Sequence, residues 1–165
     1  MDVASLNAMP PAEREAALLR CCGAAAWARR MSEAMPFADE DDLHGAADRA
    51  FATLSDDDWL AAFAHHPRIG DVSRLRERFK ASGVLSEKEQ GVAMASADDA
   101  VIERLFAMNQ AYEARHGHIF IVCATGKSAA EMLALLEARI DLEPAAELRN
   151  CAAEQAKITH LRLAG

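Results

Sequence analysis

Only one stretch of this 165-residue chain strongly favours a β-strand, and one strand alone cannot form a sheet. That stretch covers residues 119–123 and reads IFIVC, a run of β-branched, aromatic and other apolar side chains. No second segment offers a convincing strand partner. We therefore expect an all-α fold in which residues 118–125 form one short, buried, extended segment between helices.

Composition and local helix signals agree with this expectation. Aromatic residues make up 5% of the chain, and there are 8 Gly and 5 Pro residues, a mixture that favours helices over strands. The length suits one domain spanning residues 1–165, and we expect a bundle of about seven to eight helices. We expect one helix from Pro11 to Gly23 and a second that carries Trp27 and Met31 and stops before Pro36. Further helices should start near Asp41, Ser55, Ser86, Ser96, Ser128 and Pro144, and the one that starts at Ser96 should end at Gly117.

The net charge of −8 argues against a general nucleic-acid-binding protein. Residues 68–80 are a local exception, with five basic side chains against two acidic ones. We expect a loop with a short helical turn over residues 71–84, which is either simply solvated or able to steer a small anion. There is no secretory signal, no long apolar run and no C-x-x-C motif, so we expect a reduced, cytoplasmic protein that binds no membrane.

The sequence HHPRIG at residues 65–70 contains the first candidate catalytic residue. Pro67 disfavours the α conformation at His66, so a helix should end there. Histidine is tolerated in a last helical turn, and this alone would explain His66. A proline directly after the imidazole also fixes the backbone, however, which a general acid or base requires.

Three other features have both a structural and a functional interpretation. Ser86 and Glu89 form a capping box, which explains them without function, but a helix N-terminus also binds carboxylate or imide groups. Arg162 follows an apolar stripe of the last helix, either as a residue that extends to solvent or as a clamp for an anion or a carbonyl. The backbone of residues 119–125 satisfies its polar groups either by packing or by binding a planar ligand.

Five motifs occur in the order and spacing of one known family. They are HHPRIG at 65–70, SEKEQ at 86–90, MNQAY at 108–112, GHIFIVCATGKSA at 117–129 and EQAKITHLRL at 154–163. Together they resemble the 2-oxo-4-hydroxy-4-carboxy-5-ureidoimidazoline (OHCU) decarboxylases of urate breakdown, and the resemblance covers nearly the whole chain. His116 departs from the family pattern, which usually has an aromatic residue, often Phe, before the glycine.

The resemblance implies an all-helical enzyme, commonly a homodimer, that converts OHCU to S-allantoin without a metal or an organic cofactor. It implies catalytic roles for His66, Glu89 and Arg162. The chain end LRLAG lacks a peroxisomal tripeptide, which suits a bacterial-type cytoplasmic enzyme. The implied substrate-binding residues are Pro67, Ser86, Glu87, Lys88, Gln90, Ile121, Val122, Cys123, Ala124 and Thr125.

Two rival interpretations belong to other functional classes. One is a non-catalytic helical module that binds a planar heterocycle or a partner helix; it has no need of His66, Glu89 and Arg162 together. The other is a metal hydrolase that uses His65 and His66, but neighbouring side chains on a helix point in different directions. We therefore expect no metal site.

Overall fold

A computed structural model of the chain describes residues 2–68, 71–81 and 92–165. Over these residues the secondary structure consists of nine α-helices with no β-strand, which confirms the all-α prediction. None of these helices is long and apolar enough to cross a membrane. The helices are α1 (Val3–Ala8), α2 (Pro11–Cys22), α3 (Ala25–Glu33), α4 (Glu40–Phe51), α5 (Asp56–Ala64), α6 (Val72–Ala81), α7 (Val92–His116), α8 (Ala129–Arg139) and α9 (Pro144–Ala164).

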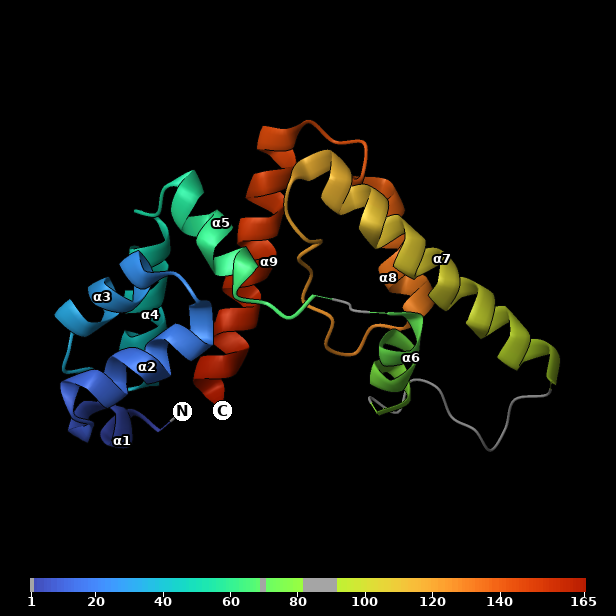
Figure 1. Ribbon diagram of the computed structural model, residues 1–165. Helices are drawn as coiled ribbons and strands as arrows, with labels where there is room; N and C mark the ends of the chain where they lie inside the picture. Colours follow the sequence, from blue (N-terminus) through green and yellow to red (C-terminus); the bar gives the residue numbers. More distant parts are fainter. Residues whose placement is uncertain (1, 69–70, 82–91) are drawn as a thin grey trace. The chain divides into compact units, whose positions relative to one another are not determined.

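The chain divides into two compact units (Figure 1), and the division falls inside α9. The first unit contains α1 to α5, residues 121–123 and α9 from Leu148 onwards. The second contains α6, α7, α8 and the first turn of α9. A single domain over residues 1–165 stays a prediction.

The core of the first unit is built on an aromatic stack. Trp27 of α3 lies against Phe51 of α4 with ring centroids 5.6 Å apart, and Phe51 lies against Trp59 of α5 at 5.5 Å. Stacked aromatic pairs stabilise a core beyond the area that they bury. One face of α9 completes this core with side chains at a four-residue spacing, namely Cys151, Gln155, Thr159 and Leu163, each at most 1% exposed.

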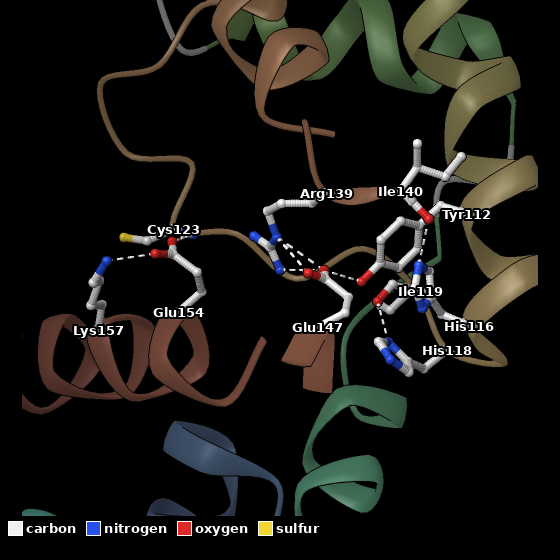
Figure 2. Close-up of polar contacts among 10 residues, drawn as sticks. All are labelled: Tyr112, His116, His118, Ile119, Cys123, Arg139, Ile140, Glu147, Glu154 and Lys157. Atoms are coloured by element: carbon white, nitrogen blue, oxygen red, sulfur yellow. Dashed lines mark hydrogen bonds and ion pairs between the residues drawn. The ribbon is translucent and has the colours of Figure 1, made fainter. Parts of the chain in front are cut away.

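The second unit contains a buried charged group between α7, α8 and α9 (Figure 2). The Glu147 side chain is fully buried, and Arg139 approaches it through Nε at 3.0 and 3.1 Å and through Nη2 at 2.6 Å. Tyr112 donates its hydroxyl to the same carboxylate, and the Arg139 guanidinium also lies over the Phe120 ring. A buried carboxylate is tolerated because it is paired and hydrogen-bonded in this way.

Helix ends follow the cap signals of the sequence. Ser55 with Asp58, and Ser128 with Glu131, form complete capping boxes at the starts of α5 and α8. The Ser55 hydroxyl and backbone N–H hold the pKa of Asp58 below its usual value. Gly23 ends α2 at a positive φ of 86°, the left-handed conformation that glycine adopts at low cost.

The segment predicted to be extended lies between α7 and α8 and forms neither a helix nor a strand. Residues 117–128 are non-helical, and within them Phe120 and Ile121 are buried at 9% and 2% exposure. Val122 to Ala124 are half-buried, while Thr125 is exposed. The predicted interruption between helices is therefore present, and its burial is deepest at Phe120 and Ile121.

Helix α1 precedes the first helix that the sequence predicted, at Pro11, and two expected boundaries were wrong. The predicted loop over residues 71–84 contains the ten-residue helix α6, because Asp71 accepts the N–H of Arg74 at 2.8 Å as a cap and Leu75 and Phe79 are buried on one face. Ser96 does not start the long helix, since α7 is already helical at Val92. Residues 93–95, between Val92 and Ser96, are Ala, Met and Ala. These are good helix formers, and their preference outweighs the local cap signal of Ser96. The expected start at Ser86 lies outside the described residues.

Candidate functional site

The C-terminus of α2 exposes backbone carbonyls that α9 satisfies. The Gly23 N–H donates to the Leu19 carbonyl at 2.8 Å, which leaves the last three carbonyls of the helix without an intrahelical donor. Arg162 donates through Nη1 to the carbonyls of Cys21 at 3.0 Å and Arg20 at 3.3 Å. A cation at a helix C-terminus is also favoured by the helix dipole.

Gln155 links the same helix end to His66. Its Nε2 group donates to the Cys22 carbonyl at 3.5 Å and to the Thr159 hydroxyl at 3.3 Å. Its Oε1 atom lies 2.6 Å from Nε2 of the His66 imidazole. Gln155 is fully buried and His66 is half-buried, so the contact between them is partly buried. The α9 stripe therefore holds the candidate catalytic histidine.

His66 follows the C-cap of α5 in a tightened turn. The N–H groups of His65 and His66 donate three residues back, to the carbonyls of Ala62 and Phe63 at 3.2 and 3.1 Å. Pro67 has no N–H with which to continue this ladder, and α5 ends two residues before the predicted end at His66. The last helical residue is Ala64, with His65 as the C-cap.

His65 packs against Gly23 at the end of α2. A Cβ atom built on Gly23 would lie 2.6 Å from Cβ and 2.9 Å from Cγ of His65. Glycine is therefore required at position 23 for two reasons, the positive φ of its backbone and the close approach of His65. His65 is otherwise exposed. The two adjacent histidines thus have different surroundings, because His65 packs against Gly23 and His66 is hydrogen-bonded to Gln155. The catalytic role of His66 stays a prediction.

The extended segment is tied to the same turn of α9 by Glu154. Its Oε2 atom accepts the backbone N–H of Cys123 at 2.7 Å, and Lys157 pairs with its Oε1 atom, as Figure 2 shows. Glu154 and Gln155 are consecutive residues, so one helical turn fixes both the 121–123 segment and His66 within the first unit. Neither residue was singled out as functional from the sequence. The only signal was their place inside the motif EQAKITHLRL.

Arg162 lies differently from the expectation of a core-facing side chain. It is exposed, because the buried stripe of α9 runs through Thr159 and Leu163, and Arg162 is displaced about 100° from Leu163 around the helix. Its carbonyl contacts agree with the clamp interpretation. Its role towards a substrate stays a prediction.

The other predicted site residues are only partly within the described chain. Pro67 is exposed, and its neighbour Arg68 pairs with Glu113 at 2.8 Å. In the basic segment Arg76 pairs with Asp99 at 2.8 Å. The residues of the second motif, Ser86, Glu87, Lys88, Glu89 and Gln90, lie outside the described residues.

The thiols of this region favour packing over reactivity. Cys21 and Cys22 are buried, and burial raises the pKa of both thiols, which disfavours the nucleophilic thiolate. Within residues 2–68, 71–81 and 92–165 we find no group of three or more His, Cys, Asp or Glu side chains arranged to hold a metal ion. Neither His65 nor His66 belongs to such a group there.

Comparison with known proteins connects these residues to one family. The family model described as OHCU decarboxylase matches residues 7–164. The uric acid degradation bifunctional protein TTL of Arabidopsis thaliana is 36% identical over 146 residues, which is 87% of this chain; the chain spans 44% of that protein's length. The 2-oxo-4-hydroxy-4-carboxy-5-ureidoimidazoline decarboxylases of Haloferax volcanii and Amia calva are 28% and 30% identical, covering 83% and 85% of this chain and 78% and 76% of their own lengths.

Solved structures agree with the sequence relatives. A crystal structure of OHCU decarboxylase in the presence of (S)-allantoin superposes with a TM-score of 0.70 at 31% identity, covering 88% of this chain and 93% of the other. A crystal structure of (S)-allantoin synthase superposes with a TM-score of 0.71 at 21% identity, covering 99% of this chain and 53% of the other, and supports the fold alone.

Proposed function

Because the chain belongs to the OHCU decarboxylase family, we propose that it decarboxylates OHCU to S-allantoin in urate breakdown. The observation that carries this proposal is the family match over residues 7–164, nearly the full chain. The geometry of the first unit supports it, because His66 is held at a helix end by a buried carboxamide. Such a fixed imidazole suits general acid–base catalysis.

The substrate itself supplies the electron sink for this reaction. When the bond between the ring carbon and the carboxylate breaks, carbon dioxide leaves and an electron pair stays on the ring. The neighbouring C=N bond accepts that pair, and its nitrogen takes up a proton. The resulting enol loses its hydroxyl proton, and the carbon that carries the ureido group is protonated. No external cofactor is needed, so the protein orients the substrate, neutralises charge and moves protons.

Three side chains divide this work in the proposed mechanism. His66 takes the hydroxyl proton next to the departing carboxylate or returns a proton to the ring. Glu89 holds the ureido or ring N–H groups, and Arg162 polarises an oxygen on which negative charge develops. Pro67, the 86–90 segment and the 121–125 backbone line the substrate. Delivery of the last proton from one face gives a single enantiomer.

We also propose a cytoplasmic homodimer, on the resemblance to the family alone. The mass of the purified protein in solution, measured by light scattering after size-exclusion chromatography, tests the dimer. A mass of one chain at micromolar concentration would contradict it.

Freshly generated OHCU tests the activity. Uncatalysed decay protonates the ring from both faces and gives racemic allantoin, so an enzyme produces a circular dichroism signal that the spontaneous reaction lacks. We expect the purified protein to give S-allantoin quickly, with activity retained in the presence of strong chelators. Racemic product at the spontaneous rate would leave a non-catalytic binding module as the better interpretation.

A further inference from the structure

Gln155 is an unusual residue for the buried stripe of α9. A carboxamide with 0% exposure loses its hydrogen bonds to water, and this costs free energy unless protein groups replace them. Both ends of this side chain are engaged, by Cys22 and Thr159 at Nε2 and by His66 at Oε1.

The partners of Gln155 determine which way its amide points. The carbonyl of Cys22 can only accept a hydrogen bond, so the atom that faces it must be the NH₂ group. Thr159 donates its single hydroxyl proton to the carbonyl of Gln155 at 2.9 Å, so its oxygen accepts from the same NH₂ group. The carbonyl oxygen of the amide therefore faces His66.

This orientation determines the tautomer of the imidazole. The Oε1 atom of Gln155 can only accept, so the ring nitrogen 2.6 Å away must carry a proton. A neutral imidazole has one N–H, and with Nε2 protonated the lone pair lies on Nδ1. We propose that Gln155 is a positioning residue that holds His66 in this tautomer, so that Nδ1 is the atom that exchanges a proton with the substrate. The part that concerns Nδ1 rests on the proposed function, in which His66 is the acid–base group.

Nuclear magnetic resonance tests the hydrogen bond without any substrate. Imidazole N–H protons normally exchange with water too quickly to be seen, whereas one held in a buried hydrogen bond gives a downfield resonance coupled to ¹⁵N. With ¹⁵N-labelled histidine, we expect one such signal from Nε2 of His66 at a pH where the ring is neutral. It should disappear in His66→Ala, which assigns it. Its absence from the wild-type protein would overturn the proposal before any variant is made.

Gln155→Met is the informative variant, because it has nearly the same shape and makes no hydrogen bond to the ring. We expect it to lose the Nε2 resonance and to lower kcat by about 10–100-fold, the size of effect seen when the partner that orients a metal-bound histidine is removed, while KM changes little. Cys151→Ala is the matched control: it removes a buried side chain one turn earlier on the same helix face and should keep both the resonance and kcat.

The outcomes separate the two proposals. A folded Gln155→Met protein that keeps the resonance would overturn the positioning role, as would loss of the resonance in Cys151→Ala. Loss of the resonance in Gln155→Met with an unchanged kcat would overturn the assignment of Nδ1. A wild-type protein with the resonance but no activity on OHCU would contradict the proposed function, while the hydrogen bond from Gln155 to His66 would stand.

Discussion

Gly23→Ala tests whether the ends of α2 and α5 jointly place His66. Its matched control is Gly117→Ala. Both glycines follow a helix in the left-handed conformation, with φ of 86° and 75°, and both donate their N–H four residues back, at 2.8 and 2.9 Å. They differ in crowding: a Cβ at Gly23 would lie 2.6 Å from Cβ of His65, whereas among the described residues no atom lies within 4 Å of one at Gly117.

The two substitutions should therefore differ in free energy. An alanine at positive φ costs about 1–2 kcal/mol at either site. At Gly23 the contact of 2.6 Å must lengthen by about 1 Å to reach ordinary carbon–carbon distances. Overpacking of this kind costs a further ~1–3 kcal/mol. We expect Gly117→Ala to lower the free energy of unfolding by about 1–2 kcal/mol and Gly23→Ala by about 2–5 kcal/mol.

Urea unfolding followed by circular dichroism measures this difference, and the OHCU assay measures its effect on catalysis. Because His65 precedes His66, a shift of about 1 Å at the end of α5 should displace the imidazole and lower kcat by about 100-fold. Gly117→Ala should leave kcat nearly unchanged once the protein is folded. Equal losses of stability and equal kcat values in the two variants would refute the argument from crowding.

Three further predictions concern single side chains. His66→Ala should lower kcat by about 10²–10⁴-fold, whereas His65→Ala should act mainly on stability; equal losses of activity in two folded variants would contradict the division of roles. Glu89→Gln should lower kcat/KM by at least about tenfold, roughly 1.4 kcal/mol, with an almost unchanged melting temperature, and normal turnover with a lowered melting temperature would indicate a cap alone. The Ser128 N–H and hydroxyl lower the pKa of Glu131, so the contribution of Glu131 to stability is present above about pH 4.3 and is lost as the pH falls through the folded pKa. In urea titrations the free energy of unfolding of Glu131→Gln should therefore fall less in acid than that of the wild type. Parallel pH curves for the two proteins would contradict this role of Glu131.

The helix ends that could be predicted are those set by nearby residues. Ser55, Ser128, Gly23 and Gly117 act within one helical turn, so the sequence alone contains the signal. Helix α6 was missed although Asp71 and the apolar residues at 72, 75 and 79 carry a helical pattern. Its many charges suggested a solvated loop, and the ion pair from Arg76 to Asp99 on α7 is not visible in a local pattern.

Within the candidate site, too, residues with a signal in their sequence neighbours could be predicted, and residues that depend on distant contacts could not. The family prediction is confirmed. Each motif alone has low specificity, but five motifs in the same order and spacing are specific to the family. His66 could be proposed because Pro67 is its neighbour in the sequence. Gln155 could not, since its importance depends on contacts with Cys22 and His66, 133 and 89 positions away. Arg162 was placed on the wrong face because half-buried residues of α9 were counted as core.

The carboxylate of Glu147 has a consequence for how this chain can vary. Arg139 and Tyr112 neutralise and hydrogen-bond it in a fully buried position. Removing one partner of such a pair costs about 3–5 kcal/mol, while replacing the whole group with apolar residues of similar volume is often neutral. A series of single substitutions that leads from the charged group to an apolar replacement therefore passes through variants that fold poorly. We therefore expect Tyr112, Arg139 and Glu147 to be replaced together or kept together, although they lie in three different helices.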